Sequence, residues 1–383
     1  MKKYLNYSFL AAIAATMTLF TSCSKDDGVE AYVPEPVQFS VGVGNLSVSG
    51  GTRTQASDTE TAWTSSIDGK FAVNDIVHIW TTDADGHYYR KAYKVSAAAA
   101  NAADPNTLTA NDAGATGSFY WGNKTEYKPY EIYSFGKAAV GDSTNTTAAQ
   151  TPDDVRKSYF CEVPADQTAV ANAIEFMFGY GTLYYGTSAK ALKVSHQLAR
   201  IDVKLVTKKN NVAVDKNTSG TSITSMPALT SETFSLTIGW NTMHRKGLFS
   251  APNYTAISTG AADDIKGETA NTGTWAAAAT PVQGTITPRV LKAQCYNETN
   301  ENFETTYSAV VIPQSFQNKD MFTVKYDGAT YIYHTPDSEF NIEAGKHYIY
   351  TVTIEDSSIS VTVAIQNWTQ VDNSGTPVEA KLQ

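Results

Sequence analysis

Short segments in which hydrophobic and polar residues alternate recur along most of the chain. An alternation with a period of two is typical of a β-strand that buries one face. Near the N-terminus, Val37, Phe39, Val41 and Val43 fall on one face of a segment that begins near Pro36. The pattern therefore predicts a first strand with four inward apolar side chains.

Two turn sequences join neighbouring alternating segments into predicted β-hairpins. These turns are residues 83–86, which end in Asp85-Gly86, and the pair Asp327-Gly328. An Asp-Gly pair provides the positive φ that a tight hairpin turn requires. The flanking segments are residues 76–82 with 88–95, and residues 322–326 with 331–333.

Three further segments, between residue 200 and the C-terminus, each place their apolar residues on one face. The residues that share a face are Ile201, Val203 and Leu205 in the first segment, Tyr348, Tyr350, Val352 and Ile354 in the second, and Ile359, Val361, Val363 and Ile365 in the third.

Many short strands at close spacing, without alternating helical segments, predict an all-β fold of antiparallel β-sandwiches. A length of 383 residues suggests about two domains in tandem. A new hydrophobic series begins near residue 190, so we place the boundary near Ser188. The predicted domains are an N-terminal sandwich over residues 36–187 and a C-terminal sandwich over residues 188–383.

The first 35 residues are predicted to target the protein for export and to anchor it, and not to be part of the folded domains. Lys2 and Lys3 precede twelve apolar or small residues, 9–20, which suits a secretory signal and is too short to span a bilayer. The end of this segment resembles a bacterial lipobox, in which residues 1–22 are removed and Cys23 is lipidated. An ordinary secretory cleavage beside a cysteine is the alternative. Residues 24–27 resemble the acidic signal that sends Bacteroidetes lipoproteins to the outer face of the outer membrane, and residues 23–35 form a linker.

Composition narrows the classes of function. The chain carries 38 acidic and 29 basic residues, for a formal net charge of −9, which argues against a nucleic-acid partner. Hydrophobic residues make up 42% of the chain, enough to bury a core. Cys161 and Cys295 are interpreted as small buried hydrophobic residues, although a pairing cannot be decided from sequence.

A search for catalytic, metal-binding or cofactor-binding motifs predicts no such site. None of the six histidines stands two to four positions from another, so a local metal-binding pair is absent. Asp83, Asp85 and His87 could begin a calcium loop, but Lys94 occupies the position where that loop needs a glutamate. The same residues are better explained as a hairpin turn. A pair of catalytic carboxylates is invisible without a structure, so an enzyme such as a glycoside hydrolase stays open.

Several short sequence segments, taken in their order along the chain, resemble those of a known protein family. They are residues 37–41 and 51–54, Trp63 with residues 71–77, and residues 120–121, 163–167, 196–203, 344–350 and 365–368. With the lipobox, this order resembles the fimbrillin family of Bacteroidales pilus proteins over essentially the whole mature chain. Asn74 stands where the family usually has glycine. The resemblance implies two transthyretin-like β-sandwich domains.

The resemblance also implies a structural subunit of a cell-surface fimbria, in the shaft, anchor or tip, that supports adhesion. Its partners would be the outer membrane, through lipid on Cys23, other pilus subunits, and host or bacterial surface receptors. A trypsin-like protease would cut between Arg53 and Thr54 and release the first strand, whose groove a neighbouring subunit would fill. An ordinary exposed arginine is the alternative for Arg53.

The C-terminal tail is the candidate for the donated strand. Val378, Ala380 and Leu382 alternate as a donor strand requires, with Pro377 at its start because proline cannot donate inside a ladder. A frayed terminus is the alternative. For the whole protein, the alternative function is a surface lipoprotein that binds glycans for a nutrient-uptake system. A row of exposed aromatic residues would favour that function.

Overall fold

The computed structural model describes the chain in segments. The described residues are 33–43, 76–82, 88–97, 106–111, 118–124, 126–134, 139–142, 159–169, 176–185, 191–208, 234–251, 273–297, 302–326, 329–355, 358–367 and 378–380. The chain divides into two compact units, Met1–Glu35 and Pro36–Gln383. All of the strands described below belong to the second unit.

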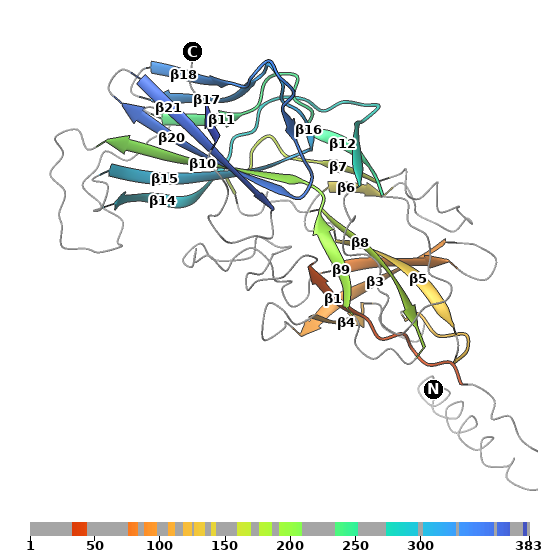
Figure 1. The fold of residues 1–383 in the computed structure, drawn as a ribbon. Helices are drawn as coiled ribbons and strands as arrows, with labels where there is room; N and C mark the ends of the chain where they lie inside the picture. Colours follow the sequence, from red (N-terminus) through yellow and green to blue (C-terminus); the bar gives the residue numbers. More distant parts are fainter. Residues whose placement is uncertain are drawn as a thin grey trace, which may run out of the picture. The chain divides into compact units, whose positions relative to one another are not determined.

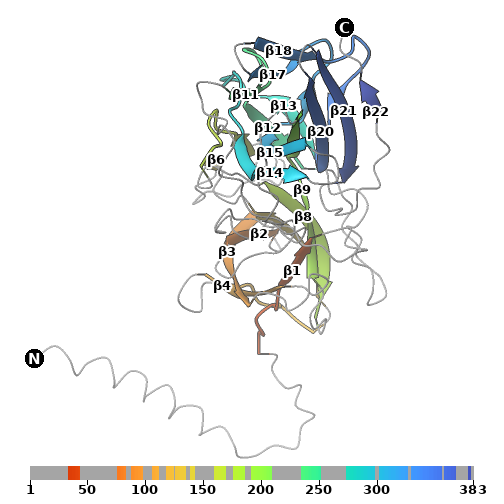
Figure 2. The same ribbon diagram turned by 90° about the vertical axis from the view of Figure 1, so that its left-hand side faces the viewer.

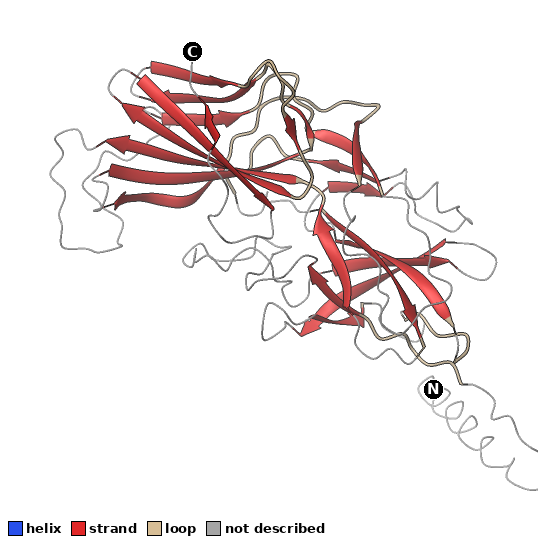
Figure 3. Cartoon of the chain, viewed as in Figure 1, coloured by secondary structure: helices blue, strands red, loops and turns tan. Residues whose placement is uncertain are grey.

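Every regular element in the described residues is a β-strand (Figure 3). The all-β prediction is therefore confirmed, whereas the transthyretin-like topology stays a prediction. No helix in the described part of the chain has the length and apolar character needed to cross a membrane.

Seven strands of the N-terminal half form a closed sheet in the order β1-β4-β3-β2-β5-β8-β9. Figure 2 shows β1 to β4 around this ring. The strands are β1 (Ser40–Val43), β2 (Ile76–Thr82), β3 (Tyr88–Ala97), β4 (Asn106–Ala110), β5 (Tyr127–Ser134), β8 (Met177–Tyr184) and β9 (Ala191–His196). Closure requires β1, because this strand pairs with β4 on one side and β9 on the other.

A six-stranded sheet of the C-terminal half has the order β14-β15-β10-β20-β21-β22 (Figure 1). Its strands are β10 (Ala199–Lys208), β14 (Arg289–Asn297), β15 (Asn302–Val311), β20 (Lys346–Glu355), β21 (Ser358–Asn367) and β22 (Val378–Ala380). Strand β22 is the last strand of the chain and lies at one edge of this sheet.

Three smaller sheets complete the described strands. They contain β11 (Phe234–Ile238), β17 (Asp320–Tyr326) and β18 (Ala329–His334); β6 (Ala139–Asp142), β7 (Tyr159–Glu162), β12 (Lys246–Ser250) and β13 (Thr274–Ala277); and β16 (Gln314–Ser315) with β19 (Asn341–Ile342).

Both predicted hairpins are confirmed. Strands β2 and β3 pair in antiparallel register from Ile76 opposite Lys94 to Thr82 opposite Tyr88. Strands β17 and β18 pair likewise, up to Tyr326 opposite Ala329. The apolar patterns and the Asp-Gly turn sequences together were sufficient to specify these local pairings.

The predicted inward faces of β10 and β20 are also confirmed. Every apolar residue predicted on these two faces is at most 5% exposed: Ile201, Val203, Leu205, Tyr348, Tyr350, Val352 and Ile354. On β21, Val361 is buried, but Ile365 is 40% exposed. Ile365 lies two residues before the end of this strand, and the side chains of Ile359 and Val363 lie outside the described residues.

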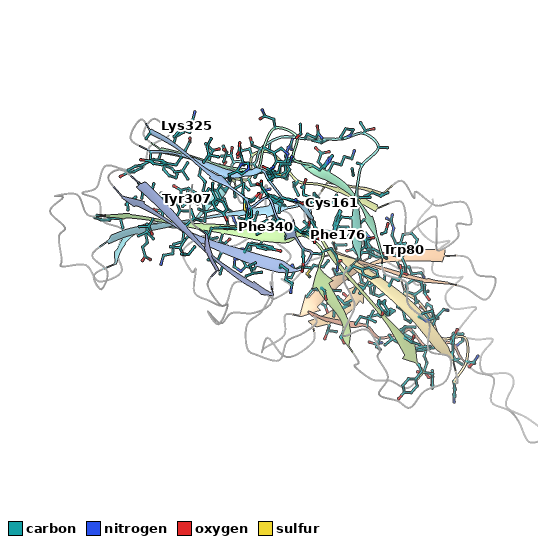
Figure 4. The ribbon with its side chains drawn as sticks, turned by 45° about the horizontal axis from the view of Figure 1, so that its top comes forward. Trp80, Cys161, Phe176, Tyr307, Lys325 and Phe340 are labelled. Carbon is teal, nitrogen blue, oxygen red and sulfur yellow. The ribbon has the colours of Figure 1, made fainter. Side chains whose placement is uncertain are left out.

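The predicted division at residues 187 and 188 stays a prediction, but three strand pairings cross it. Strand β9 belongs to the closed sheet with β1 and β8. Strand β7 pairs with β12, so a strand from before the boundary joins one from after it. One cluster of buried hydrophobic residues also includes side chains from both sides of the boundary, such as Cys161 and Phe176 from before it and Tyr307 from after it, all labelled in Figure 4.

Candidate functional site

The first strand occupies a slot between two strands that are far from it in sequence. Ser40 pairs with Thr107 of β4 in antiparallel register. On its other side, β1 runs parallel to β9, with Ser40 opposite Ala191 and Val43 opposite Val194. Both backbone edges of β1 are therefore used, and β1 is the element that joins β4 to β9.

The segment before β1 is tied to the same surroundings. The Val37 amide donates to the Phe119 carbonyl at 2.8 Å, and the Leu108 amide donates to the Phe39 carbonyl at 3.1 Å. Pro36 forms an isolated bridge with Tyr120. These bonds use backbone atoms, so they hold the segment without selecting its side chains.

The predicted inward residues of this segment are buried where the structure describes them. Val37, Phe39 and Val41 are 4%, 3% and 0% exposed, whereas Gln38 between them is exposed. The side chain of Val43 lies outside the described residues. Complete burial of an apolar side chain of this size contributes about 1.5–3 kcal/mol.

Three aromatic rings surround Phe39, and we call them the aromatic cage: Tyr93, Phe119 and Tyr130. Their ring centroids lie 5.0, 6.2 and 4.9 Å from that of Phe39. All three approach in T-shaped geometry, with interplanar angles of 72°, 76° and 84°. Such edge-to-face pairs are worth about 0.5–1.5 kcal/mol each beyond the area that they bury.

The cage is held by contacts of its own. The Phe119 amide donates to the Tyr93 hydroxyl at 2.9 Å, and the Lys91 ammonium lies 5.0 Å from the centroid of the Phe119 ring. Burial is the main reason that the pKa of the Tyr93 phenol is raised to about 12. Burial also raises the pKa of Tyr130. The cage is therefore a dry site built from three different parts of the chain.

A buried charged triad that sequence analysis missed lies in the six-stranded sheet. Arg200 donates from Nε and Nη2 to the two carboxylate oxygens of Asp202, both at 2.9 Å, and His347 Nε2 lies 2.9 Å from Asp202 Oδ2. The three residues are 3%, 5% and 6% exposed. Burial alone would raise the pKa of Asp202, but the charge of Arg200, followed by His347 and the hydrogen bonds from both, holds it well below its usual range.

Parallel pairing of β10 with β20 brings this triad together. Arg200 is the register partner of His347 although the two residues are far apart in sequence. Both belong to segments that carried the family resemblance, 196–203 and 344–350. The alternation of β10 places Arg200 and Asp202 on the face opposite Ile201, and no pattern along the chain indicated that this polar face is also buried.

A second buried polar residue, Gln167, forms two side-chain hydrogen bonds to a strand backbone, where a neighbouring strand would otherwise bond. Its side-chain amide donates to the Val310 carbonyl at 2.9 Å, and its Oε1 accepts from the Val310 amide at 2.9 Å. The register of β14 with β15 begins at Ser308, so Gln167 satisfies backbone groups beyond the end of that pairing. Gln167 ends the family-like segment 163–167, and its role there is structural.

The candidate donor tail pairs within its own chain. Val378 lies opposite Val363, and Ala380 lies opposite Val361, in antiparallel register. Leu382 lies outside the described residues. The tail thus forms a short strand, β22, on β21, and the structure describes three of its residues in that strand.

The processing and lipidation residues predicted from sequence, Cys23, Arg53 and Thr54, lie outside the described residues. The same holds for Asp83, Asp85 and His87 of the rejected calcium loop. Within the described segments, no group of three or more histidine, cysteine, aspartate or glutamate side chains could hold a metal ion. Cys161 is completely buried in β7, and Cys295 lies in β14 of a different sheet.

The fold and the β1 slot define an all-β protein whose closed N-terminal sheet depends on its first strand. The Fimbrillin-like family matches residues 54–368. This match covers most of the chain, so the chain belongs to the Fimbrillin-like family. No match to a curated protein sequence was found.

Solved structures of low sequence identity are similar to this chain over most of its length. A candidate cell adhesion protein from Bacteroides ovatus is 16% identical with a TM-score of 0.51, over 88% of this chain and 99% of that chain. A candidate cell adhesion protein from Bacteroides uniformis is 13% identical with a TM-score of 0.47, over 87% and 98%. A fimbrial assembly protein from Parabacteroides distasonis is 11% identical with a TM-score of 0.41, over 91% and 100%. At a TM-score of 0.51, the first of these three shares the fold of this chain.

Proposed function

We propose that this protein is a structural, non-enzymatic subunit of a cell-surface pilus, assembled by exchange of its first β-strand. Membership of the Fimbrillin-like family supports the pilus role. The observation that carries the exchange mechanism is the position of β1, which bridges β4 and β9 and comes from the N-terminal end of the folded unit.

Loss of β1 would expose both backbone and side-chain surface. Strands β4 and β9 would each lose one of their two partners, and the space occupied by Val37, Phe39 and Val41 would open as an apolar groove. An exposed edge with apolar pockets is the arrangement that accepts an added strand from another chain. Each of the three side chains contributes about 1.5–3 kcal/mol when buried, so the drive to refill the groove is strong.

Cleavage between Arg53 and Thr54 is the proposed trigger. A cut there breaks the covalent link between β1 and the rest of the folded unit. Only backbone hydrogen bonds and side-chain packing would then hold β1 in place. The responsible enzyme would be a trypsin-like protease, because the cut follows an arginine. Before the cut, the precursor would be held on the outer membrane by lipid on Cys23, and an anchor subunit would keep that lipid.

The C-terminal tail is the proposed donor to another subunit. Its three described residues form β22 at the edge of the six-stranded sheet. A three-residue edge strand has few backbone bonds to lose, and the alternation of Val378, Ala380 and Leu382 provides one apolar face. Whether the subunit serves as shaft, anchor or tip depends on which of these two exchanges it uses.

Limited proteolysis followed by strand exchange tests the proposal. Unlipidated precursor is cut with trypsin, and mass spectrometry locates the cut. A labelled peptide of residues 36–43 is then added in excess under mildly denaturing conditions. We expect cleavage after Arg53, release of the N-terminal fragment and uptake of the peptide. The variant Arg53→Gln, treated in the same way, should keep its first strand.

The proposal is wrong if correctly cleaved protein retains its own fragment and never takes up the peptide.

Glycan binding is the alternative function. A row of exposed aromatic side chains is the feature that would distinguish it from pilus assembly. Five large hydrophobic side chains of the described residues are exposed, and Tyr120 is the one aromatic side chain among them. No observation on the described surface therefore favours glycan binding over pilus assembly.

A further inference from the structure

We propose that the groove of this protein selects its incoming strand by an aromatic side chain at the Phe39 position. We further infer that the strand comes from a protein other than a second copy of this chain. This inference rests on the proposed strand exchange and names the partner by its chemistry. The partner is an extended segment with an aromatic residue flanked, two positions away on each side, by residues of valine size.

Backbone pairing in the groove cannot make this selection. Any strand that runs parallel to β9 and antiparallel to β4 can form the same ladder. The Phe119 carbonyl and the Leu108 amide, which bond the backbone of residues 37 and 39, are also indifferent to side chains. Discrimination must therefore come from the inward positions of Val37, Phe39 and Val41.

Among these three positions, the one at Phe39 has the largest side chain and the most specific geometry. The rings of the aromatic cage stand edge-on to a ring at this position, with centroids no more than 6.2 Å away. An aliphatic side chain would forfeit these ring contacts, and a small one would leave a cavity. Protein interiors tolerate such cavities poorly, because the surrounding side chains relax only in part.

The cage keeps its shape through bonds that do not involve β1. The Phe119 amide bonds to the Tyr93 hydroxyl, and Lys91 contacts both the Phe119 ring and the Ser118 carbonyl. The rings of Tyr93 and Phe119 stack on each other with an interplanar angle of 18°. A cage fixed by its own contacts cannot collapse easily around a smaller side chain, and this strengthens the selection.

The C-terminal tail of this chain does not match the cage in any register. If Val378 takes the place of Val37, then Ala380 stands at the Phe39 position. If Leu382 stands at the Phe39 position, its aliphatic side chain forfeits the three ring contacts of the aromatic cage. If Val378 stands at the Phe39 position, a smaller aliphatic side chain likewise faces the aromatic cage and leaves a cavity. A second copy of this protein is therefore a poor donor to this groove.

Peptide competition on the cleaved protein tests the inference. Full-length precursor is cut in solution, so that β1 stays bound without a covalent link, and unlabelled peptides compete with a labelled peptide of residues 36–43. The competitors are the native 36–43 peptide, its Phe39→Ala and Phe39→Tyr variants, the tail peptide 376–383 and that tail peptide with Ala380→Phe. The last peptide gives the tail an aromatic residue without changing its length or its charge.

We expect the Phe39→Ala peptide to compete at least about a hundredfold more weakly than the native peptide, since Phe-to-Ala changes in cores are costly. The tail peptide should be as weak, Phe39→Tyr should stay within about tenfold of native, and Ala380→Phe should strengthen the tail at least about tenfold. A native tail peptide that competes as well as the 36–43 peptide overturns the inference and leaves strand exchange intact. If even the native 36–43 peptide does not exchange, the proposed function fails and the inference fails with it.

Discussion

The ring of Phe39 stands edge-on to the ring of Tyr130, with centroids 4.9 Å apart and planes inclined by 84°. Phe39 lies just before β1, and Tyr130 lies in β5, which pairs with β2 and β8 rather than with β1. The contact therefore crosses the interior of the closed sheet. It links the first strand to the opposite part of the sheet, in addition to its two neighbours in the ladder.

Replacement of Phe39 by alanine should destabilise the intact chain by about 3–5 kcal/mol, because the large side chain is removed from a packed aromatic cage. Phe39→Leu should cost less, since it keeps most of the volume. Urea unfolding at neutral pH measures both. Val33→Ala is the control, because Val33 is 76% exposed and its loss should change stability by no more than about 0.5 kcal/mol. A loss below about 1 kcal/mol for Phe39→Ala would contradict the packing described here.

Asp202 should make the protein sensitive to acid. Its pKa is lower in the folded chain than in the unfolded chain, mainly because the charges of Arg200 and His347 outweigh the effect of burial. Folding therefore stabilises the ionised form, and this contribution is present above about pH 4 and is lost as the pH falls below that value.

The variant Asp202→Asn separates this effect from those of other carboxylates. It removes the carboxylate that pairs with buried Arg200, so it should lose about 3–5 kcal/mol at neutral pH. The difference between wild type and variant should shrink between pH 4 and pH 2, because Asp202 becomes protonated in the unfolded wild-type chain while it stays ionised in the folded chain. Urea unfolding across this pH range gives the measurement. A difference that stays constant over the range would show that Asp202 does not carry the predicted linkage.

A charge on the inward face of β20 should be far more harmful than the same charge on the opposite face. Val352 is 0% exposed, so Val352→Asp buries an unpaired carboxylate and should cost several kcal/mol. Thr351→Asp is the matched control, because Thr351 is half-buried on the other face and has Lys204 as a register partner. Equal shifts in the melting temperature of the two variants would contradict the assigned faces of β20.

Gly345 should be intolerant of branched side chains. Its φ is 68°, in the left-handed region, and its amide donates to the Leu198 carbonyl at 2.9 Å. Gly345→Val should cost about 1–2 kcal/mol or more from backbone strain. Gly345→Asn should cost less, because asparagine adopts this conformation more readily. Thermal unfolding that ranks asparagine below valine would show that φ is not the limiting factor.

Cys23→Ala should abolish attachment of the precursor to the outer membrane and leave the fold unchanged. Lipidation requires the thiol, and the folded unit begins at Pro36, so Cys23 belongs to the other unit of the chain. Membrane fractionation with radiolabelled palmitate measures attachment, and circular dichroism checks the fold. Recovery of the alanine variant in washed outer membranes would show that Cys23 is not the anchor.

The periodic pattern of the sequence was enough for local structure. It predicted the all-β class, both hairpins and the inward faces of β10 and β20, because alternation and turn chemistry act over a few neighbouring residues. It also predicted that Val37, Phe39 and Val41 share one face. The order of short segments along the chain carried the family resemblance, which the match over residues 54–368 supports.

The tertiary structure alone decided which distant strands meet. The parallel pairings of β1 with β9 and of β10 with β20 join segments whose alternation is the same whether the partner is parallel, antiparallel or absent. The triad of Arg200, Asp202 and His347 follows from the second of those pairings, and the aromatic cage comes from three other parts of the closed sheet and its connections. Alternation predicts one buried face for a strand. Strand β10 buries residues on both faces, because Arg200 and Asp202 pair with each other and with His347 of the neighbouring strand β20. Long-range pairing depends on the packing energy of the whole chain, and no local pattern encodes that energy.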